Sequence, residues 1–121
     1  MNLISRIFKF EPKIKNKMAA EFVNEKISTK KVVVFSKSFC PYCTLAKNVL
    51  NKYIGTSIPT DQYEVVELEN DPNCNKIQDY LSEITGARTV PRVFVNSKFI
   101  GGGTDVEKLD KMNQLEPLLV K

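Results

Sequence analysis

Apolar residues along the chain recur at two spacings, one typical of helices and one typical of strands. Phe22, Val23 and Ile27 have helical spacing, and the β-branched run at residues 32–35 predicts a buried strand directly after that helix. Residues 44–54 return to helical spacing, and Gly55 predicts the end of this second helix. The alternating residues 63–68 predict a second strand, so the first half of the chain has the order helix, strand, helix, strand.

The second half of the chain continues with a helix, a hairpin and a last helix. Asp71 as the N-cap and Pro72 in the first turn predict a helix start, and Gly86 predicts its end. Residues 93–95 and 99–100 predict a hairpin around residues 96–98, and residues 104–107 match a capping box that starts a helix through Met112. The element order αβαβαββα predicts an α/β fold with a small four-stranded mixed sheet flanked by helices.

Charge separates residues 1–17 from the rest of the chain. Those residues hold five basic side chains and one acidic one, which accounts for the whole formal charge of +4, because residues 18–121 hold 13 of each sign. We therefore expect a domain at 18–121, preceded by a basic arm that is either a solvated extension or an organelle-targeting segment. The balanced body carries no basic footprint for nucleic acid, and the sequence has no apolar run long enough to span a membrane.

The chain has three cysteines and no histidine. An odd and unevenly spaced set of cysteines does not form the disulfide framework of a small secreted domain, so we expect a reducing compartment. We expect the cytoplasm, with the mitochondrion as the alternative that a targeting arm would imply. Without an imidazole, histidine-based acid–base catalysis is excluded, and cysteine chemistry is the chemistry that the sequence offers.

The chemistry-bearing motif is Cys-Pro-Tyr-Cys at residues 40–43, where the first predicted strand passes into a helix. The unpaired N–H groups of a helix N-terminus stabilise a thiolate at Cys40, and Cys43 lies one turn later, within disulfide reach. Lys37 adds a positive charge just before the loop. A zinc site would need two more ligands and only Cys74 remains, while a purely structural disulfide does not suit a reducing compartment. A redox pair is therefore favoured, and Cys74 is interpreted as an incidental thiol.

Three motifs in order make residues 18–120 resemble the dithiol glutaredoxins. They are the Cys-Pro-Tyr-Cys site, the stretch Thr-Gly-Ala-Arg-Thr-Val-Pro-Arg-Val-Phe at residues 85–94, and the Gly-Gly pair at 101–102 followed by Thr-Asp at 104–105. The resemblance implies a thioredoxin-like fold and a cis bond between Val90 and Pro91. There is one departure, because many relatives have a cysteine where this chain has Gly103.

The resemblance also implies a function, a glutathione-dependent thiol–disulfide oxidoreductase. Its partners would be glutathione, glutathionylated proteins and low-molecular-weight disulfides, with glutathione reductase acting indirectly, and the protein would be a monomer without a metal. Cys40 and Cys43 would be the catalytic pair. The residues expected to contact glutathione are Lys37, Tyr42, Gln78, Thr89, Val90, Pro91, Gly102, Thr104 and Asp105, with Arg88 as a further candidate at the glycyl end.

Two alternatives remain at this point. A thioredoxin-like disulfide reductase would share the fold but take electrons from a protein reductase, and the charges expected around a tripeptide argue against it. An iron–sulfur carrier would hold a cluster between two chains through Cys40 and two glutathiones, and Pro41 disfavours it within the family.

Overall fold

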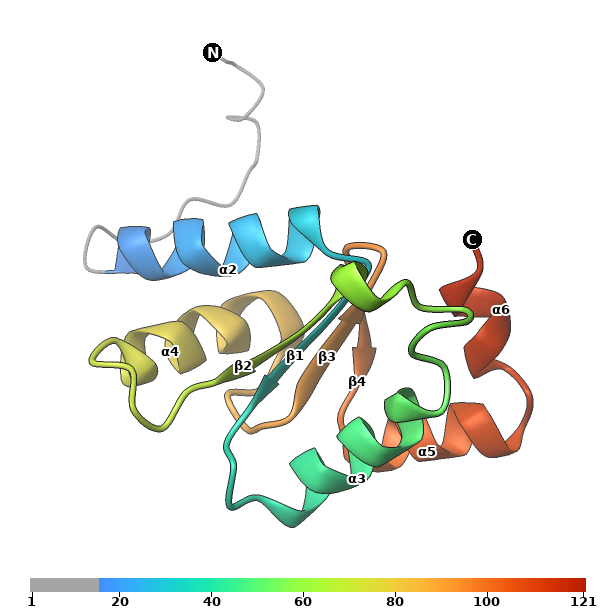
Figure 1. Cartoon of the computed structure of the whole chain (residues 1–121). Coiled ribbons are helices and arrows are strands. Elements are labelled where there is room, and N and C mark those ends of the chain that lie inside the picture. The colour runs from blue at the N-terminus through green and yellow to red at the C-terminus, as the bar shows by residue number, and fades with distance from the viewer. Residues whose placement is uncertain (1–15) are drawn as a thin grey trace.

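The computed structural model describes residues 16–121 of the chain. In chain order its elements are α2 (Lys17–Thr29), β1 (Val32–Ser36), α3 (Pro41–Asn51), the short 3₁₀ turn η2 (Thr60–Gln62), β2 (Tyr63–Glu67), α4 (Cys74–Thr85), β3 (Arg92–Val95), β4 (Lys98–Gly101), α5 (Gly103–Lys111) and α6 (Leu115–Leu119) (Figure 1).

The four strands form one mixed sheet in the order β2-β1-β3-β4. β1 runs parallel to β2 and antiparallel to β3, and β3 is antiparallel to β4. All five residues of β1 are buried, which is why its sequence is a continuous apolar run rather than an alternating one. The predicted class, a small four-stranded mixed sheet flanked by helices, is confirmed.

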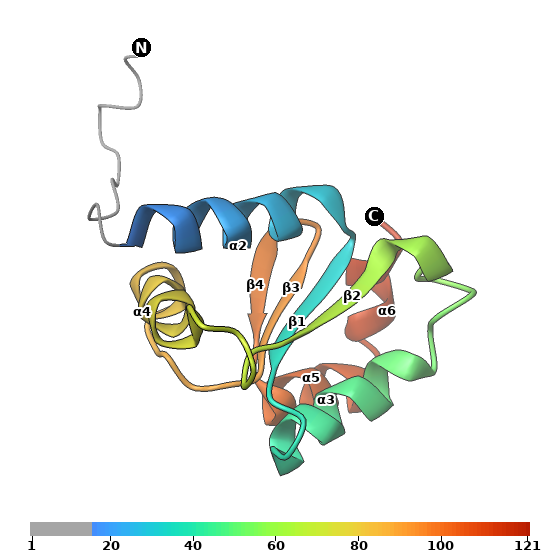
Figure 2. The ribbon, with the colours of Figure 1, turned by 60° about the vertical axis from the view of Figure 1, so that its left-hand side comes forward.

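Helices cover both faces of the sheet (Figures 1 and 2). Successive residues of β1 point to opposite faces, so Val33 and Phe35 pack in the core with α2 and α4, while Val32 and Val34 pack in the core with α3, α5 and α6. β1 therefore joins the two cores, and its carboxyl end points to the loop that begins α3.

The predicted start of the third helix is wrong by two residues, because α4 begins at Cys74 and not at Pro72. The carboxylate of Asp71 accepts the N–H of Asn73 at 2.7 Å, and its carbonyl accepts the N–H of Cys74 at 3.0 Å. The side chain of Asp71 thus closes a turn ahead of the helix instead of capping the helix itself. The predicted stop is confirmed, since Gly86 adopts a left-handed φ of +94°.

The end of the chain also differs from the sequence prediction. α5 begins at Gly103, so Thr104 lies inside the helix and the capping box predicted for residues 104–107 is wrong. Asp105 instead accepts the N–H of Gly102 at 2.8 Å. The short helix α6 was not predicted, and it adds the fully buried Leu115 and Leu119 to the core beside α3 and α5.

The described fold begins slightly before the domain boundary expected at Met18. α2 starts at Lys17, and Asn16 ahead of it is buried. Most of the predicted basic arm, residues 1–15, lies outside the described residues. No helix within residues 16–121 is both long enough and apolar enough to cross a membrane.

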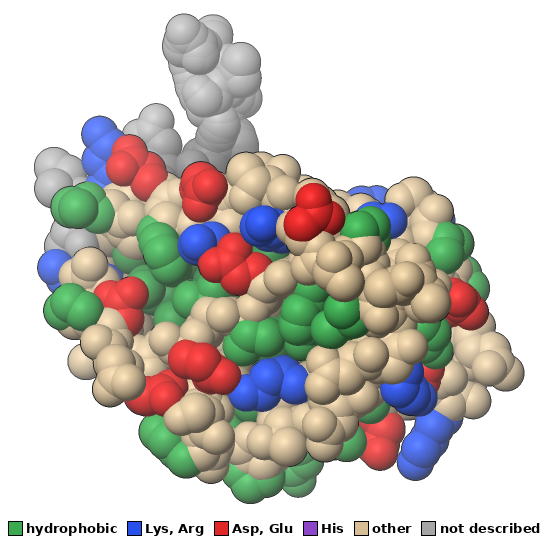
Figure 3. Space-filling model, viewed as in Figure 1, with side chains coloured by type: hydrophobic (Ala, Val, Ile, Leu, Met, Phe, Trp, Pro, Cys, Tyr) green, Lys and Arg blue, Asp and Glu red, His purple; other side chains and the backbone are tan. Residues whose placement is uncertain are grey.

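Charged side chains of both signs intermix on the face drawn in Figure 3. Two ion pairs flank the edge strand β2, one between Lys26 of α2 and Glu64 and the other between Lys47 of α3 and Glu67, each at 2.8 Å. Such charges protect an exposed sheet edge from pairing with another chain.

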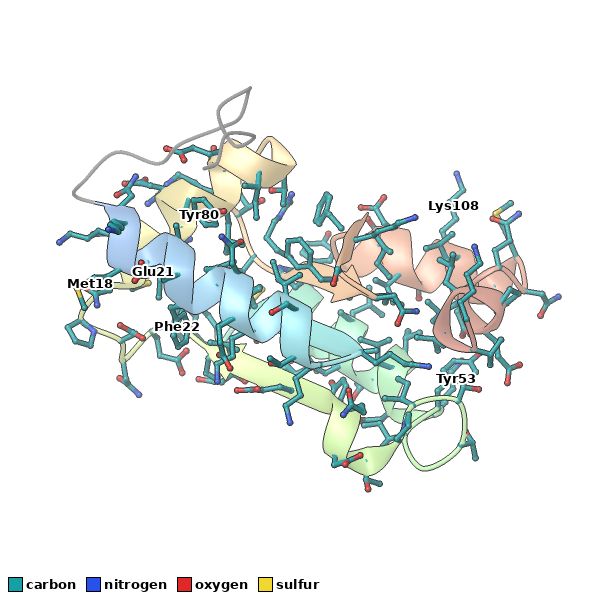
Figure 4. All side chains as sticks on the ribbon, turned by 90° about the horizontal axis from the view of Figure 1, so that it is seen from above. Met18, Glu21, Phe22, Tyr53, Tyr80 and Lys108 are labelled. Carbon is teal, nitrogen blue, oxygen red and sulfur yellow. The ribbon has the colours of Figure 1, made fainter. Side chains whose placement is uncertain are left out.

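The end of α3 is tied to α5 through one carboxylate. Asp110 of α5 accepts hydrogen bonds from the ammonium of Lys52 and the hydroxyl of Tyr53. Figure 4 places Tyr53 on the side of the molecule opposite Tyr80 of α4. The bond from Lys52 is the main reason that the pKa of Asp110 lies below its usual range, and the bond to Asp110 raises the pKa of Tyr53 to about 12.

We predict that Asp110→Asn lowers the free energy of unfolding at pH 7 by about 1–2 kcal/mol, because a charged acceptor shared by two donors is lost. The folded-state pKa of Asp110 lies below the unfolded value of about 3.9, so its contribution is present above that pH and is lost as pH falls through the folded-state pKa. Urea unfolding should therefore show a gap between variant and parent that is full at pH 7 and narrows as pH falls below about 3.9. Asp79→Asn, which loses only an exposed ion pair, is the control. A gap between Asp110→Asn and the parent that does not change with pH would contradict the tie.

Candidate active site

Cys40 occupies the N-cap of α3, where β1 has ended and the chain turns into the helix (Figure 1). Its backbone is extended, and its Sγ accepts the N–H of Cys43 at 3.2 Å. Pro41 follows in the first turn, where the missing N–H breaks no helical bond. The sulfur therefore faces the positive end of the helix, the environment that stabilises a thiolate.

The loop before Cys40 is held from outside by Glu69. The backbone N–H of Ser38 donates to one carboxylate oxygen at 3.2 Å, and the Ser38 hydroxyl donates to the other. The bond from the hydroxyl is the main reason that the pKa of Glu69 lies below its usual range. The loop after β2 thus fixes the segment that presents Cys40.

The two cysteines of the motif differ in access. Cys40 is partly exposed, whereas Cys43 is 0 % exposed and its Sγ accepts the N–H of Lys37 at 3.5 Å. Burial, and next the hydrogen bond to Cys40, raise the pKa of the Cys43 thiol to about 11. Of the pair, only Cys40 can meet an external disulfide, and Cys43 stays protonated at neutral pH. Both cysteines are free thiols in this structure.

The opposite wall of the site is the loop before β3. The Val90–Pro91 peptide bond is cis, as the family resemblance implied. The Cys40 thiol lies 3.7 Å from the carbonyl oxygen of Val90 and donates to it. This contact brings the sulfur against a backbone edge that comes from 50 residues further along the chain.

A pocket of about 450 Å³ opens beside this contact. Its lining residues come from three segments that the fold brings together, and they are Tyr42, Thr89, Val90, Pro91, Arg92, Gly102, Gly103, Thr104 and Asp105. The N-terminus of the nine-residue helix α5 forms one end of the pocket, and unpaired N–H groups at such an end bind anions. The Asp105 carboxylate lies at the same end, so the pocket offers an anion site and a negative charge side by side.

Seven of the nine residues expected to bind glutathione line this pocket, and Lys37 and Gln78 do not. Gln78 is only 6 % exposed, and both ends of its amide are engaged within the protein. That burial does not favour direct contact with a ligand. Cys74, interpreted as incidental, donates to the Gln78 amide oxygen at 3.3 Å.

Two lining residues, Arg92 and Gly103, were not among the sequence candidates. Arg92 directly follows the cis proline, and its position inside the 85–94 motif was the only signal for it. Burial lowers the pKa of the Arg92 guanidinium, and the negative charge of Asp105 acts in the opposite direction. The positive charge of Arg92 and the negative charge of Asp105 thus belong to the same pocket.

Gly103 marks the closest approach between α5 and the Cys-x-x-Cys segment. A Cβ atom at residue 103 would lie 2.5 Å from the carbonyl oxygen of Tyr42 and 3.2 Å from its carbonyl carbon. Because these are backbone atoms, a side chain here requires the two helix ends to move apart. Glycine in place of cysteine at this position therefore removes a thiol and also allows the backbone of α5 to approach Tyr42 this closely.

Comparisons with known proteins agree with this geometry. The family model described as Glutaredoxin matches residues 32–100, which include the Cys-x-x-Cys segment and the cis proline. The chain belongs to the glutaredoxin family. It is 40 % identical to Glutaredoxin-1 of variola virus over 102 residues, which is 84 % of this chain and 92 % of that protein.

Solved structures give the same result for the fold. Oxidized glutaredoxin 2 from Chlamydomonas reinhardtii is 44 % identical with a TM-score of 0.78, over 86 % of this chain and 92 % of that one. A buckwheat glutaredoxin–glutathione complex is 31 % identical with a TM-score of 0.79, over 90 % and 94 % of the two chains. This glutaredoxin is therefore a thiol–disulfide oxidoreductase with a thioredoxin-like fold. Within residues 16–121, no group of three His, Cys, Asp or Glu side chains is placed to hold a metal.

We predict that Gly103→Ala lowers the free energy of unfolding of this glutaredoxin by about 1–3 kcal/mol, because the added methyl group is forced against the Tyr42 carbonyl. Gly102→Ala is the matched control for stability. Its Cβ would meet its nearest neighbour, the Pro91 carbonyl oxygen, at an ordinary 3.4 Å, and its φ is −95°. Urea unfolding of the two variants tests the contact. Equal losses of unfolding free energy in both variants would show that the contact between residue 103 and the Tyr42 carbonyl does not determine the stability of the variant.

A second prediction concerns the buried thiol. At pH 7.5, iodoacetamide should modify Cys40 and the partly exposed Cys74 of the native protein while leaving Cys43 unmodified, because Cys43 is both buried and protonated below about pH 11. Mass spectrometry of the digested protein measures each site, and alkylation of the unfolded protein shows that all three thiols can react. Modification of native Cys43 at the rate of Cys74 would contradict the assigned burial.

Proposed function

We propose that this glutaredoxin uses glutathione to reduce glutathione mixed disulfides and protein disulfides, with Cys40 as the nucleophile and Cys43 as its redox partner. The observation that carries the proposal is the pocket itself. A backbone edge and an anion-binding helix end line one cavity of about 450 Å³, and the partly exposed Cys40 sulfur lies against that edge at the Val90 carbonyl.

The two ends of the pocket match the chemistry of glutathione, which has two carboxylates and one ammonium. The N–H groups of Thr104 and Asp105 would hold the γ-glutamyl carboxylate, and the Asp105 carboxylate would face the ammonium. The cysteinyl part would lie along the backbone of Val90, beside Cys40. The similar buckwheat glutaredoxin forms a complex with glutathione, which supports glutathione as the ligand of this pocket.

Other proposed contacts follow from the pocket lining. Thr89, Pro91 and Gly102 would shape its walls, and the exposed ring of Tyr42 would cover the sulfur atoms. Lys37 is proposed as the cation for the glycyl carboxylate, although it lies outside the pocket lining. Gln78 is better placed to support the loop than to contact the tripeptide.

The reaction takes place in two exchanges. The Cys40 thiolate attacks the glutathione sulfur of the mixed disulfide, the old S–S bond breaks, and the substrate leaves as a thiolate that takes a proton from water. A second glutathione thiolate then attacks the adduct, forming glutathione disulfide and returning Cys40 as a thiolate. The helix N-terminus at Cys40 makes it a better leaving group in this second exchange.

Cys43 provides a second route for protein disulfides. When Cys40 is bonded to a protein substrate, the Cys43 thiol loses its proton and attacks the Cys40 sulfur, giving a Cys40–Cys43 disulfide and a free substrate thiol. Two glutathiones then reduce that disulfide. The burial of Cys43 and its pKa of about 11 restrict this thiol to attack on Cys40.

Location and assembly are proposed from the sequence alone. An odd and unevenly spaced set of three cysteines suits a reducing compartment, the cytoplasm or, through the basic arm, the mitochondrion. We propose that the protein acts as a monomer, as the resemblance of its sequence to the dithiol glutaredoxins implies.

We predict that replacing Cys40 and replacing Cys43 have different effects on the two reductase activities. Cys40→Ser should abolish reduction of a glutathionylated peptide, because a serine hydroxyl is not ionised near neutral pH and the chain has no histidine to activate it. Cys43→Ser should keep that activity within roughly threefold while losing most reduction of a protein disulfide, since only the latter needs the second thiol. Rates are measured with glutathione and glutathione reductase.

Cys74→Ser is the matched control, a third cysteine outside the pocket, and it should retain both activities. A parallel assay with thioredoxin reductase in place of glutathione tests the alternative electron donor. Activity of the parent protein only in that second assay would refute the proposed glutathione dependence.

A further inference from the structure

Three successive backbone carbonyls in the loop before β3 each accept a hydrogen bond from a different side chain. The donors are Gln78 to Arg88, Arg92 to Thr89, and Cys40 to Val90. Thr89 and Val90 form the backbone edge of the pocket, so these three bonds fix the wall along which the cysteinyl part of glutathione would lie.

Gln78 holds the first carbonyl from inside the protein. Its Nε2 donates to the Arg88 carbonyl at 2.8 Å, and its Oε1 accepts the S–H of Cys74 at 3.3 Å. Because a carbonyl can only accept, the Arg88 contact fixes which end of the amide faces the loop. A side chain that is 6 % exposed and bonded at both ends acts as a rigid support.

Arg92 holds the second carbonyl with several donors at once. Its Nε donates to the Thr89 carbonyl at 2.8 Å and one terminal nitrogen donates to the Thr89 hydroxyl at 3.1 Å, while the other lies 3.4 Å from the Thr85 hydroxyl. The guanidinium also lies over the ring of Phe99, 4.9 Å from its centroid. Stacking and a planar set of donors give this side chain a fixed geometry that lysine cannot reproduce.

The third bond lasts only while Cys40 is a thiol. When Cys40 ionises or bonds to a sulfur atom, the Val90 carbonyl loses its donor and, beside a thiolate, faces a like partial charge. The wall then has to be held by the two bonds that do not depend on the sulfur. These are the bonds from Gln78 and Arg92.

We propose that Gln78 and Arg92 form a clamp that positions the Thr89–Val90 edge for glutathione throughout the reaction. Both are positioning residues, because they act through backbone carbonyls and not on the reacting sulfur. The proposal rests on the proposed function, which supplies glutathione as the ligand of this edge.

The test compares Arg92→Gln with Lys98→Gln, which removes the same charge from the exposed side chain of the neighbouring strand β4. In protein without glutathione, ¹⁵N relaxation should show the order parameters of Thr89 and Val90 falling from about 0.85 toward 0.6 in Arg92→Gln only. The KM for a glutathionylated peptide should rise about tenfold in that variant, with kcat within about twofold, because a bond from a charged donor is lost. Lys98→Gln should leave the order parameters of Thr89 and Val90 and the KM unchanged.

Two further variants separate a clamp from other roles. Arg92→Lys keeps the charge without the planar donors and should match Arg92→Gln, and Gln78→Met should loosen the same two residues through the other bond. Full recovery of KM in Arg92→Lys would overturn the clamp in favour of a simple pocket charge. A raised KM with unchanged order parameters would overturn it in favour of direct contact with glutathione.

The glutathione-dependent activity of the parent protein distinguishes failure of the proposed function from failure of the clamp. If the parent protein shows no glutathione-dependent activity, the proposed function fails and the clamp loses its ligand with it. If the parent protein is active and Arg92→Gln matches it in both KM and order parameters, the clamp alone is overturned.

Discussion

The close approach of α5 to the start of α3 is the constraint on which the site depends. Glycine at residue 103 lets the backbone of α5 reach the carbonyl of Tyr42, where any Cβ would come within 2.5 Å. At the other end of the same helix pair, Asp110 binds Lys52 and Tyr53 of the α3 end. These two contacts hold the thiolate-stabilising start of α3 and the anion-binding start of α5 close to one pocket, although Pro41 and Gly103 lie 62 residues apart in the chain.

The second feature of the site is that its two cysteines differ in exposure and in hydrogen bonding. Cys40 is partly exposed and its thiol donates to a backbone edge, whereas Cys43 is buried and its pKa is raised to about 11. The edge itself is supported from behind by Gln78 and Arg92, neither of which needs to touch the reacting sulfur. Of the two cysteines, only the partly exposed Cys40 is accessible to a substrate, and the surrounding residues orient that substrate.

Most of the fold could be predicted from the sequence because its elements have strong local signals. The apolar run of β1, the Cys-x-x-Cys helix and the stop at Gly86 were all predicted, and the structure confirms them. The start of α4 was misplaced because Asp71 caps either a helix or a turn, and only tertiary structure decides between them. Gly103 was missed because its role depends on Tyr42, a contact between distant segments that no periodicity reveals. Arg92 was missed because its bond to the Thr89 carbonyl, three residues earlier, leaves no periodic signal in the sequence.

We infer that the pocket between Cys40 and the N-terminus of α5 receives glutathione. The most direct test is a crystal structure of the Cys43→Ser variant with glutathione bonded to Cys40, since this variant cannot form the internal disulfide. We expect the cysteinyl backbone beside Val90 and the γ-glutamyl carboxylate at the N–H groups of Thr104 and Asp105. Electron density for the tripeptide on the other side of Cys40, away from α5 and the Val90 edge, would contradict it.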